Sequence, residues 1–289
     1  MVTVPRYFPV EPGPLHMRAR LRRFPVDCGN GIRDACHFIV DEEATRYRAA
    51  KVTPARPGGP APRARWSMRD DTPARAAALD AVQAWVAATL AIEAPGVVLP
   101  AGADRRGWWW ALSAAVQEDL VVMHRGPAAG EPILMHVSFP SAWRPEAVAE
   151  ADFQGIHGPV PGFVDTAAQA VSMFDSMVER GPYVRFVWAL VADDVLDHHP
   201  DEGGARRWGP GCDGWLRVER QITVPFPAAE ASLFIIRTFV TPFAALGGEE
   251  RAVIAAAVEA MPDVVRRYKG MAGNEGYIAA ALRRAEASR

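Results

Sequence analysis

The sequence is poor in cysteine and lysine and has no long apolar run, and these scarcities exclude several classes of protein. Cys28, Cys36 and Cys212 are an odd and widely spaced set, which argues against a disulfide framework and favours a reducing compartment. No apolar run approaches the roughly 18–20 residues that span a bilayer. Residues 1–23 lack the apolar segment of a secretory signal. We therefore expect a cytoplasmic protein without a membrane partner.

An excess of charge of one sign is also absent, because 32 basic and 34 acidic residues give a net charge of −2. This balance does not favour nucleic acid as a partner. Lys51 and Lys269 are the only lysines, and the many arginines indicate a GC-rich, bacterial gene. The sequence has no phosphate loop, dinucleotide fingerprint, HExxH motif, GxSxG elbow or paired CxxC motif. An oxidoreductase of this sequence would need an external source of electrons.

The 289 residues, of which 49% are hydrophobic, suffice for a substantial core. Apolar periodicity predicts both helices and strands. Helices are predicted over 41–51, 72–94 (capped by Thr72), 106–116, from a cap at Asp165 or Thr166 to about 178, 249–260 and 275–287. Strands are predicted over 119–125, 133–139, 183–191, 215–224 and 233–241.

The order of these elements is a hairpin, a segment with a helix, and a three-stranded meander, which is typical of a PAS-like domain. We therefore predict an α+β fold with a PAS-like antiparallel five-stranded sheet, one face of which holds a ligand, and flanking N- and C-terminal helices. Residues 1–71 are predicted to form an N-terminal extension with a Pro-rich linker at 52–71. Residues 72–289 are predicted to form a single domain.

Two arginines interrupt apolar strand faces. Arg220 shares a face with Val218 and Ile222, and Arg237 shares one with Ile235 and Phe239. A buried arginine requires an anion, so the pair could contact a ligand carboxylate or propionate. The alternative is a structural ion pair with Glu219 or another internal carboxylate.

The other candidates are histidines. His157 lies before Pro159 and Pro161, which stiffen its loop, and it is either a metal or heme ligand or a core histidine satisfied by the backbone. His124 and His136 are interpreted as cross-strand surface residues. His198 and His199 fall in the long polar connection 192–214 and are expected to lie in a solvated loop outside the core.

Five ordered segments resemble the catalytic, heme-binding subunits of heme-dependent oxidative N-demethylases. They are VQEDL at 116–120, FPSAW at 139–143, IHGPVP at 156–161, RVERQ at 217–221 with FIIRTFVTP at 234–242, and YKG at 268–270. The resemblance covers most of the chain from about residue 70. It implies a PAS-like domain that binds heme b and removes a methyl group from a small secondary amine as formaldehyde, using O2 and electrons from a flavin/iron–sulfur reductase.

The resemblance also implies that His157 is the axial ligand of the heme iron, and it offers heme propionates as partners of Arg220 and Arg237. Glu219 and Gln221, on the opposite face of their strand from Arg220, are then weaker candidates for groups near the bound oxygen. The distal residues stay unassigned.

The chain departs from the family where a Lys and a Gly usually stand, since it has Val148 and Glu150 there. The substrate is therefore left as a small amine or related metabolite, oxidised by N-demethylation or a related C–H or N–H oxidation. Electrons would come from an NAD(P)H-linked reductase or a ferredoxin. The alternatives are a PAS-like heme sensor and a non-catalytic heme-binding protein.

Overall fold

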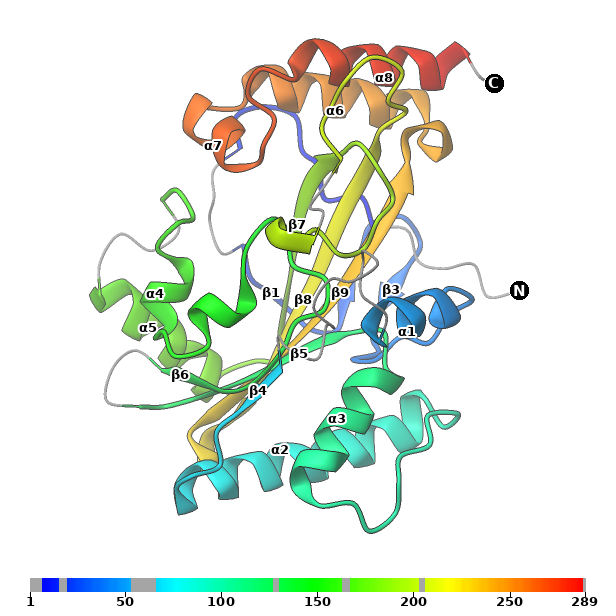
Figure 1. Ribbon diagram of the computed structural model, residues 1–289. Coiled ribbons are helices and arrows are strands. Elements are labelled where there is room, and N and C mark those ends of the chain that lie inside the picture. The colour runs from blue at the N-terminus through cyan, green and yellow to red at the C-terminus, as the bar shows by residue number, and fades with distance from the viewer. Residues whose placement is uncertain are drawn as a thin grey trace.

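The computed structural model describes residues 7–15, 20–52, 66–126, 130–162, 167–202 and 206–287 (Figure 1). Most of the predicted linker, the centre of the predicted hairpin loop at 126–130 and the proposed caps Asp165 and Thr166 lie outside the described residues.

The long helices lie close to the predicted ranges. The α-helices within the described residues are α1 Ala44–Val52, α2 Pro73–Glu93, α3 Arg105–Ala115, α4 Phe153–His157, α5 Ala167–Glu179, α6 Gly248–Ala260, α7 Asp263–Tyr268 and α8 Glu275–Ala287. At the start of α2, Thr72 Oγ1 accepts a hydrogen bond from the Arg75 N–H at 3.2 Å, as its N-cap position predicts. The sequence did not predict α4 and α7, because five or six residues are too few to show a helical period.

The strands form one large antiparallel sheet and a small two-stranded one. The large sheet has the order β1-β7-β8-β9-β5-β6-β4, and β2 pairs with β3. The strands are β1 Arg22–Arg23, β2 Val26–Asp27, β3 Arg33–Asp34, β4 Trp66–Met68, β5 Asp119–His124, β6 Glu131–His136, β7 Tyr183–Val191, β8 Trp215–Phe226 and β9 Ala231–Pro242.

The α+β class is confirmed, but the predicted five strands become seven. The five long strands agree with the predicted ranges, and β1 and β4 add one short strand to each edge of the sheet. Segments of two and three residues have no readable alternation, so the sequence could not indicate them. Both edge strands come from the first 71 residues of the chain.

Each face of the sheet is covered by different elements (Figure 1). Strand residues point alternately to the two sides, and Arg220 is the cross-strand partner of Arg237, so these two share a face that we call the arginine face. Helices α2, α6 and α8 pack on it. The opposite face carries Val121 and Phe234 and packs against Phe153 of α4 and Phe174 of α5; we call it the His157 face.

Helix α2 is the only helix in the described residues with the length and apolar composition of a membrane span. Its Leu79, Val82 and Val86 are fully buried and pack in the core of the arginine face. The apolar residues on this side of α2 are therefore accounted for by packing within the chain.

Candidate functional site

His157 is the last residue of α4 and is held in one tautomer by the helix. Asp152 caps α4 by accepting the Gly155 N–H at 2.7 Å. The Nδ1–H of His157 donates to the carbonyl oxygen of Phe153 at 2.8 Å, so Nε2 carries the lone pair. Burial lowers the pKa of His157 to about 4, although the Phe153 carbonyl opposes this shift. The imidazole is therefore neutral at physiological pH, which is the form that binds a metal.

A partly exposed strip of side chains crosses the centre of the His157 face. It consists of Arg185, Val187 and Ala189 of β7, Glu219 and Gln221 of β8, and Ile236 of β9. Their neighbours on the arginine face of the two inner strands, such as Arg220, Ile222 and Ile235, are fully buried. One face of the inner strands is thus filled by the chain itself, and the other is left partly accessible.

Two cations are partly exposed on or near β7, one within the strip and the other bonded to the strand's backbone. Arg185 lies opposite Gln221 in the β-ladder, and its positive charge contributes to the lowered pKa of His157. Lys269 follows α7, and its Nζ donates to the carbonyl oxygen of Trp188. Burial lowers the pKa of Arg185 to about 10 and that of Lys269 to about 8. Both cations are therefore poorly solvated although their side chains are partly exposed.

Glu219 is the carboxylate of the strip, and neighbouring side chains hold both of its oxygens. Ser141 Oγ donates to Oε1 at 2.5 Å, and Gln221 Nε2 donates to Oε2 at 2.9 Å. The guanidinium of Arg217 lies behind it, with Nε 3.9 Å from Oε1. These contacts fix the carboxylate on the His157 face, opposite to Arg220 on the same strand.

Arg217 is fully buried and joins two loops to the sheet. Its Nη1 donates to the carbonyl of Leu196 at 2.8 Å, and its Nη2 donates to that of Phe139 at 2.7 Å. Its Nε donates to Ser141 Oγ at 2.9 Å. Arg217 thereby positions the serine that donates to Glu219.

The structure pairs Arg220 with Asp34 through two hydrogen bonds of 2.6 and 2.7 Å. Arg220 also donates to the carbonyls of Cys36 and His37, and its side chain has no exposed area. These contacts match the structural alternative, with Asp34 in place of the suggested Glu219.

Arg237 is paired less completely. Its Nη2 donates to Asp41 at 2.7 Å, and its guanidinium lies 3.7 Å from the ring centroid of Tyr47. Nε and Nη1 have no hydrogen-bond partner in the described residues, and neither does Oε2 of the buried Glu118. Asp41 and Tyr47 come from the N-terminal 71 residues, as does Asp34.

The three predicted site residues do not converge. His157 lies on one face of the sheet, and Arg220 and Arg237 lie on the other, beneath the N-terminal segment. The sheet separates both arginines from the His157 face, and on their own face Asp34 and Asp41 already pair with them. The role of these arginines in holding propionates stays a prediction, and their contacts favour the structural alternative.

The expectation of surface positions for the other histidines was wrong. His124 and His136 are 7% and 2% exposed, and both lie on the arginine face, with His124 opposite Glu131 and His136 opposite Leu120. They do not face each other, because they occupy different rungs of the hairpin.

The connection 192–214 is also not a solvated loop throughout, because His198 and His199 are 2% and 3% exposed. Acidic residues form hydrogen bonds with both buried imidazoles and so offset the cost of their burial. Asp193 Oδ1, for example, lies 2.9 Å from His198 Nε2. His198 also forms an isolated bridge with Ser141.

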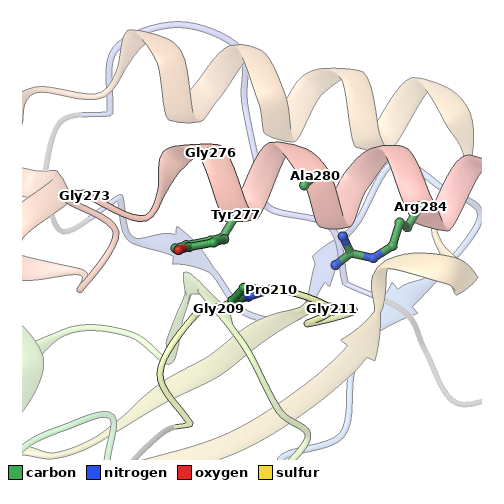
Figure 2. A pocket seen from close by; sticks show the side chains of 8 residues that line it. All are labelled: Gly209, Pro210, Gly211, Gly273, Gly276, Tyr277, Ala280 and Arg284. Atoms are coloured by element: carbon green, nitrogen blue, oxygen red, sulfur yellow. The ribbon is translucent and has the colours of Figure 1, made fainter.

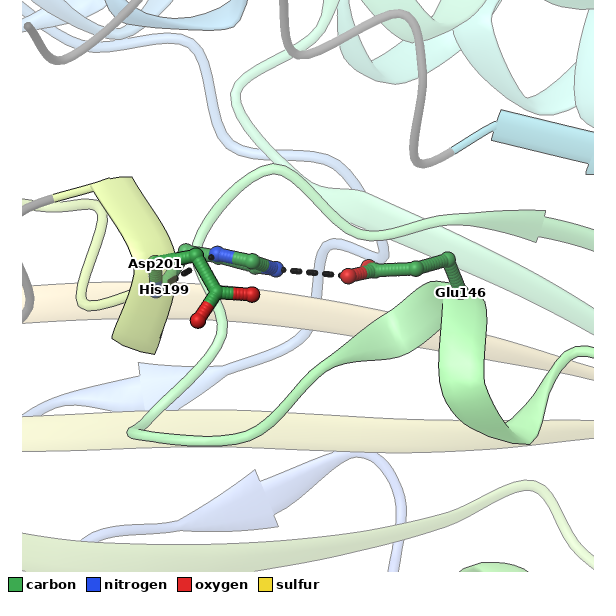
Figure 3. Close-up of side chains that lie close together, drawn as sticks. All are labelled: Glu146, His199 and Asp201. Atoms are coloured by element: carbon green, nitrogen blue, oxygen red, sulfur yellow. Dashed lines mark hydrogen bonds and ion pairs between the residues drawn. The ribbon is translucent and has the colours of Figure 1, made fainter. Parts of the chain in front are cut away.

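Glu146, His199 and Asp201 place three potential metal ligands within 4.8 Å of one another (Figure 3). His199 Nδ1 accepts the Asp201 N–H at 3.2 Å, so Nε2 bears the proton and donates to Glu146 at 2.9 Å. The Asp201 carboxylate is already held by Arg144 at 2.6 and 2.8 Å. These hydrogen bonds link the segment of Arg144 and Glu146 to the segment of His199 and Asp201. The polar atoms already bind one another, which does not favour a metal site.

A hollow of about 460 Å³ lies apart from the strip, between the loop at 209–211 and α8 (Figure 2). Its lining is Gly209, Pro210, Gly211, Gly273, Gly276, Tyr277, Ala280 and Arg284. No histidine or carboxylate lines it, so we do not assign the chemistry to it.

The sequence profile of one family, described as "Haem-dependent oxidative N-demethylase, alpha subunit-like", matches residues 104–277. The match spans more than half of the chain and includes all five segments on which the resemblance rests. The chain therefore belongs to this family of heme-dependent, oxidative N-demethylase-like proteins. A search of curated proteins gives no match.

The residues of the His157 face fit a heme. His157 offers a neutral imidazole whose other nitrogen is bonded to a carbonyl, which is the usual arrangement of a metal-ligating histidine. Partly buried apolar side chains lie on and around α4, among them Trp143, Ile156 and Val160, and suit a largely apolar macrocycle. Arg185, opposite Gln221 in the β-ladder, supplies positive charge on the same face of the sheet.

Sequence reasoning missed Arg185, Arg217 and Lys269. Arg185 interrupts the apolar strand β7 just as Arg220 interrupts β8, so the same anomaly could have indicated it. Arg217 and Lys269 stood within the segments that carry the resemblance, but nothing local showed that they approach Glu219.

Proposed function

We propose that the chain binds heme b on the His157 face and oxidises a small amine or related metabolite, by oxidative N-demethylation or a related C–H or N–H oxidation. The observation that supports this most is the fixed tautomer of His157 within the region that matches the family. We also propose that β5 to β9 are the PAS-like unit. Their sheet order places the hairpin beside the last strand of the meander, so one continuous face is available to a ligand.

His157 would hold the iron through Nε2, while the Phe153 carbonyl keeps the imidazole oriented. When bound, heme would supply the centre that binds and activates O2. Glu219 and Gln221 lie on the same face and are the polar side chains of the strip that could orient an amine N–H. Hydrogen bonds from Ser141 and Gln221 hold the Glu219 side chain in place on this face.

Val148 stands where the family usually has a different residue, and it packs among the apolar side chains around α4. An apolar residue here adds to the apolar surroundings of α4, which carries His157. We therefore propose the reaction class and leave the identity of the amine to experiment.

Purified protein supplied with heme is expected to develop a Soret band that shifts on reduction and again with CO, because a neutral imidazole is available to the iron. Titration with heme, followed by absorbance, measures this. A protein that stays colourless with added heme would remove the basis of the proposed function.

Turnover is expected only with an external electron supply. The chain has neither a dinucleotide fingerprint nor the cysteines for an iron–sulfur cluster, so NADPH and an N-methyl amine alone should consume no O2. Adding a ferredoxin–reductase pair should start O2 uptake and formaldehyde release. Heme binding without turnover under either condition would favour the sensor or non-catalytic alternative, and turnover with peroxide alone would favour a peroxygenase.

A further inference from the structure

We propose that Glu118 and Arg237 hold a buried water molecule between them, as an internal hydration site beneath the N-terminal segment. The ligand of this site is water, and not an ion or a metabolite. The inference goes beyond the proposed function, because Arg237 lies on the face of the sheet opposite to His157 and the site does not need heme.

The β-ladder places the two side chains together. Asp119 at the start of β5 is the cross-strand partner of Ile236, so the next rung brings Glu118 opposite Arg237. Residues directly opposite each other in an antiparallel pair point to the same side of the sheet, with Cβ atoms about 4.5–5.5 Å apart. Glu118 and Arg237 are therefore neighbours on the arginine face.

The N-terminal segment holds one part of each side chain. Glu118 Oε1 accepts the Ile39 N–H at 2.9 Å, and Arg237 Nη2 donates to Asp41 Oδ2 at 2.7 Å. The other oxygen of Asp41 accepts a hydrogen bond from Gln117 Nε2 at 2.7 Å. These bonds fix Glu118 and Arg237 beneath two residues that stand close together in the N-terminal segment.

The remaining polar atoms of the two side chains are buried without a partner. Glu118 and Arg237 are 0% and 1% exposed, and Oε2 of Glu118 and Nε and Nη1 of Arg237 form no hydrogen bond within the described residues. Arg237 forms its ion pair with Asp41, although the opposite charge of Glu118 stands on the facing strand. Unsatisfied buried groups are costly, so native proteins pair nearly all of them with the chain or with ordered water.

Water is the small molecule whose hydrogen bonds match both groups. A carboxylate oxygen accepts hydrogen bonds, and the N–H groups of a guanidinium donate them. A water molecule can donate to Glu118 Oε2 and accept from Arg237, and buried waters typically make about two to four such bonds. A bound anion would instead meet the charge of Glu118, and a bound cation would meet that of Arg237.

A high-resolution crystal structure of the full chain tests the site directly. The expected result is a water peak within about 3.2 Å of both Glu118 Oε2 and one of the unpaired nitrogens of Arg237. Crystals soaked in bromide should show no anomalous peak at this place, because the site does not take an anion.

Nuclear magnetic resonance of the 15N-labelled protein tests the site in solution, with Arg220 as the matched control. The Nε–H of Arg237 is expected to show a nuclear Overhauser effect to a long-lived water. The Nε–H of Arg220 should show none, because it is bonded to Asp34 at 2.6 Å. Arg237→Lys and Arg220→Lys assign the two signals. Glu118→Met should remove most of the effect at Arg237, since the water then loses its carboxylate acceptor.

Several results would overturn the site. A direct ion pair between Glu118 and Arg237, or another group of the chain in this place, would leave no room for a bridging water. A water peak that contacts only one of the two residues, or an unchanged effect in a folded Glu118→Met variant, would show that they do not share it. A bromide peak would make it an anion site. If Glu118→Met does not fold, the wild-type crystal structure decides.

Discussion

Replacing His157 with alanine is expected to weaken heme binding by more than about 100-fold. Loss of a group that merely orients a metal ligand typically costs 10- to 100-fold in metal affinity, so loss of the ligand itself should cost more. The expected cause is the removal of Nε2, whose lone pair is fixed by the Nδ1–H bond to the Phe153 carbonyl. Titration of the Soret band in wild type and variant measures the change.

His124→Ala and His136→Ala are the controls, because both histidines lie on the opposite face of the sheet. They are buried, so each variant must be compared per mole of folded protein. Added imidazole should restore the heme spectrum of His157→Ala by entering the space left by the side chain, which a purely structural role would not allow. An unchanged spectrum in His157→Ala would show that another residue binds the iron.

Replacing Arg220 with leucine is expected to destabilise the fold by about 3–5 kcal/mol, the usual cost of removing one partner from a buried ion pair. Asp34 would remain buried without its cation, and the carbonyls of Cys36 and His37 would lose their donor. Urea denaturation of wild type and variant measures the loss. Heme bound per folded molecule should stay the same, because Arg220 lies away from the His157 face.

The double variant Arg220→Leu with Asp34→Leu is expected to recover much of the lost stability, since neither charge is then left unpaired. A double-mutant cycle separates the ion pair from the packing of the two side chains. If Arg220→Leu has normal stability but loses heme, Arg220 binds a propionate and the structural interpretation is wrong.

The fold could be predicted largely from local patterns. The apolar periods over 183–191 and 215–224 indicated β7 and most of β8, and Thr72 with Pro73 indicated the start of α2. The pattern that specifies each of these elements lies within a few residues along the chain, so it can be read from the sequence. The edge strands β1 and β4 could not be predicted, because they form only by pairing with strands that are distant in the sequence. β1 pairs with β7 at Val184, and β4 pairs with β6 at His136.

By itself the sequence determined that His157 sits in a short, proline-flanked segment and that Arg220 and Arg237 each interrupt the apolar face of a strand. It also supported membership of the heme-dependent family. Only the tertiary structure decided what lies opposite each group. Asp34, 186 residues from Arg220 in the chain, occupies the arginine's fork, and Arg185 lies on the other face of the sheet. A strand pattern specifies which residues share a face, but long-range packing decides which face meets which partner, because an ion pair depends on proximity in space and not in sequence.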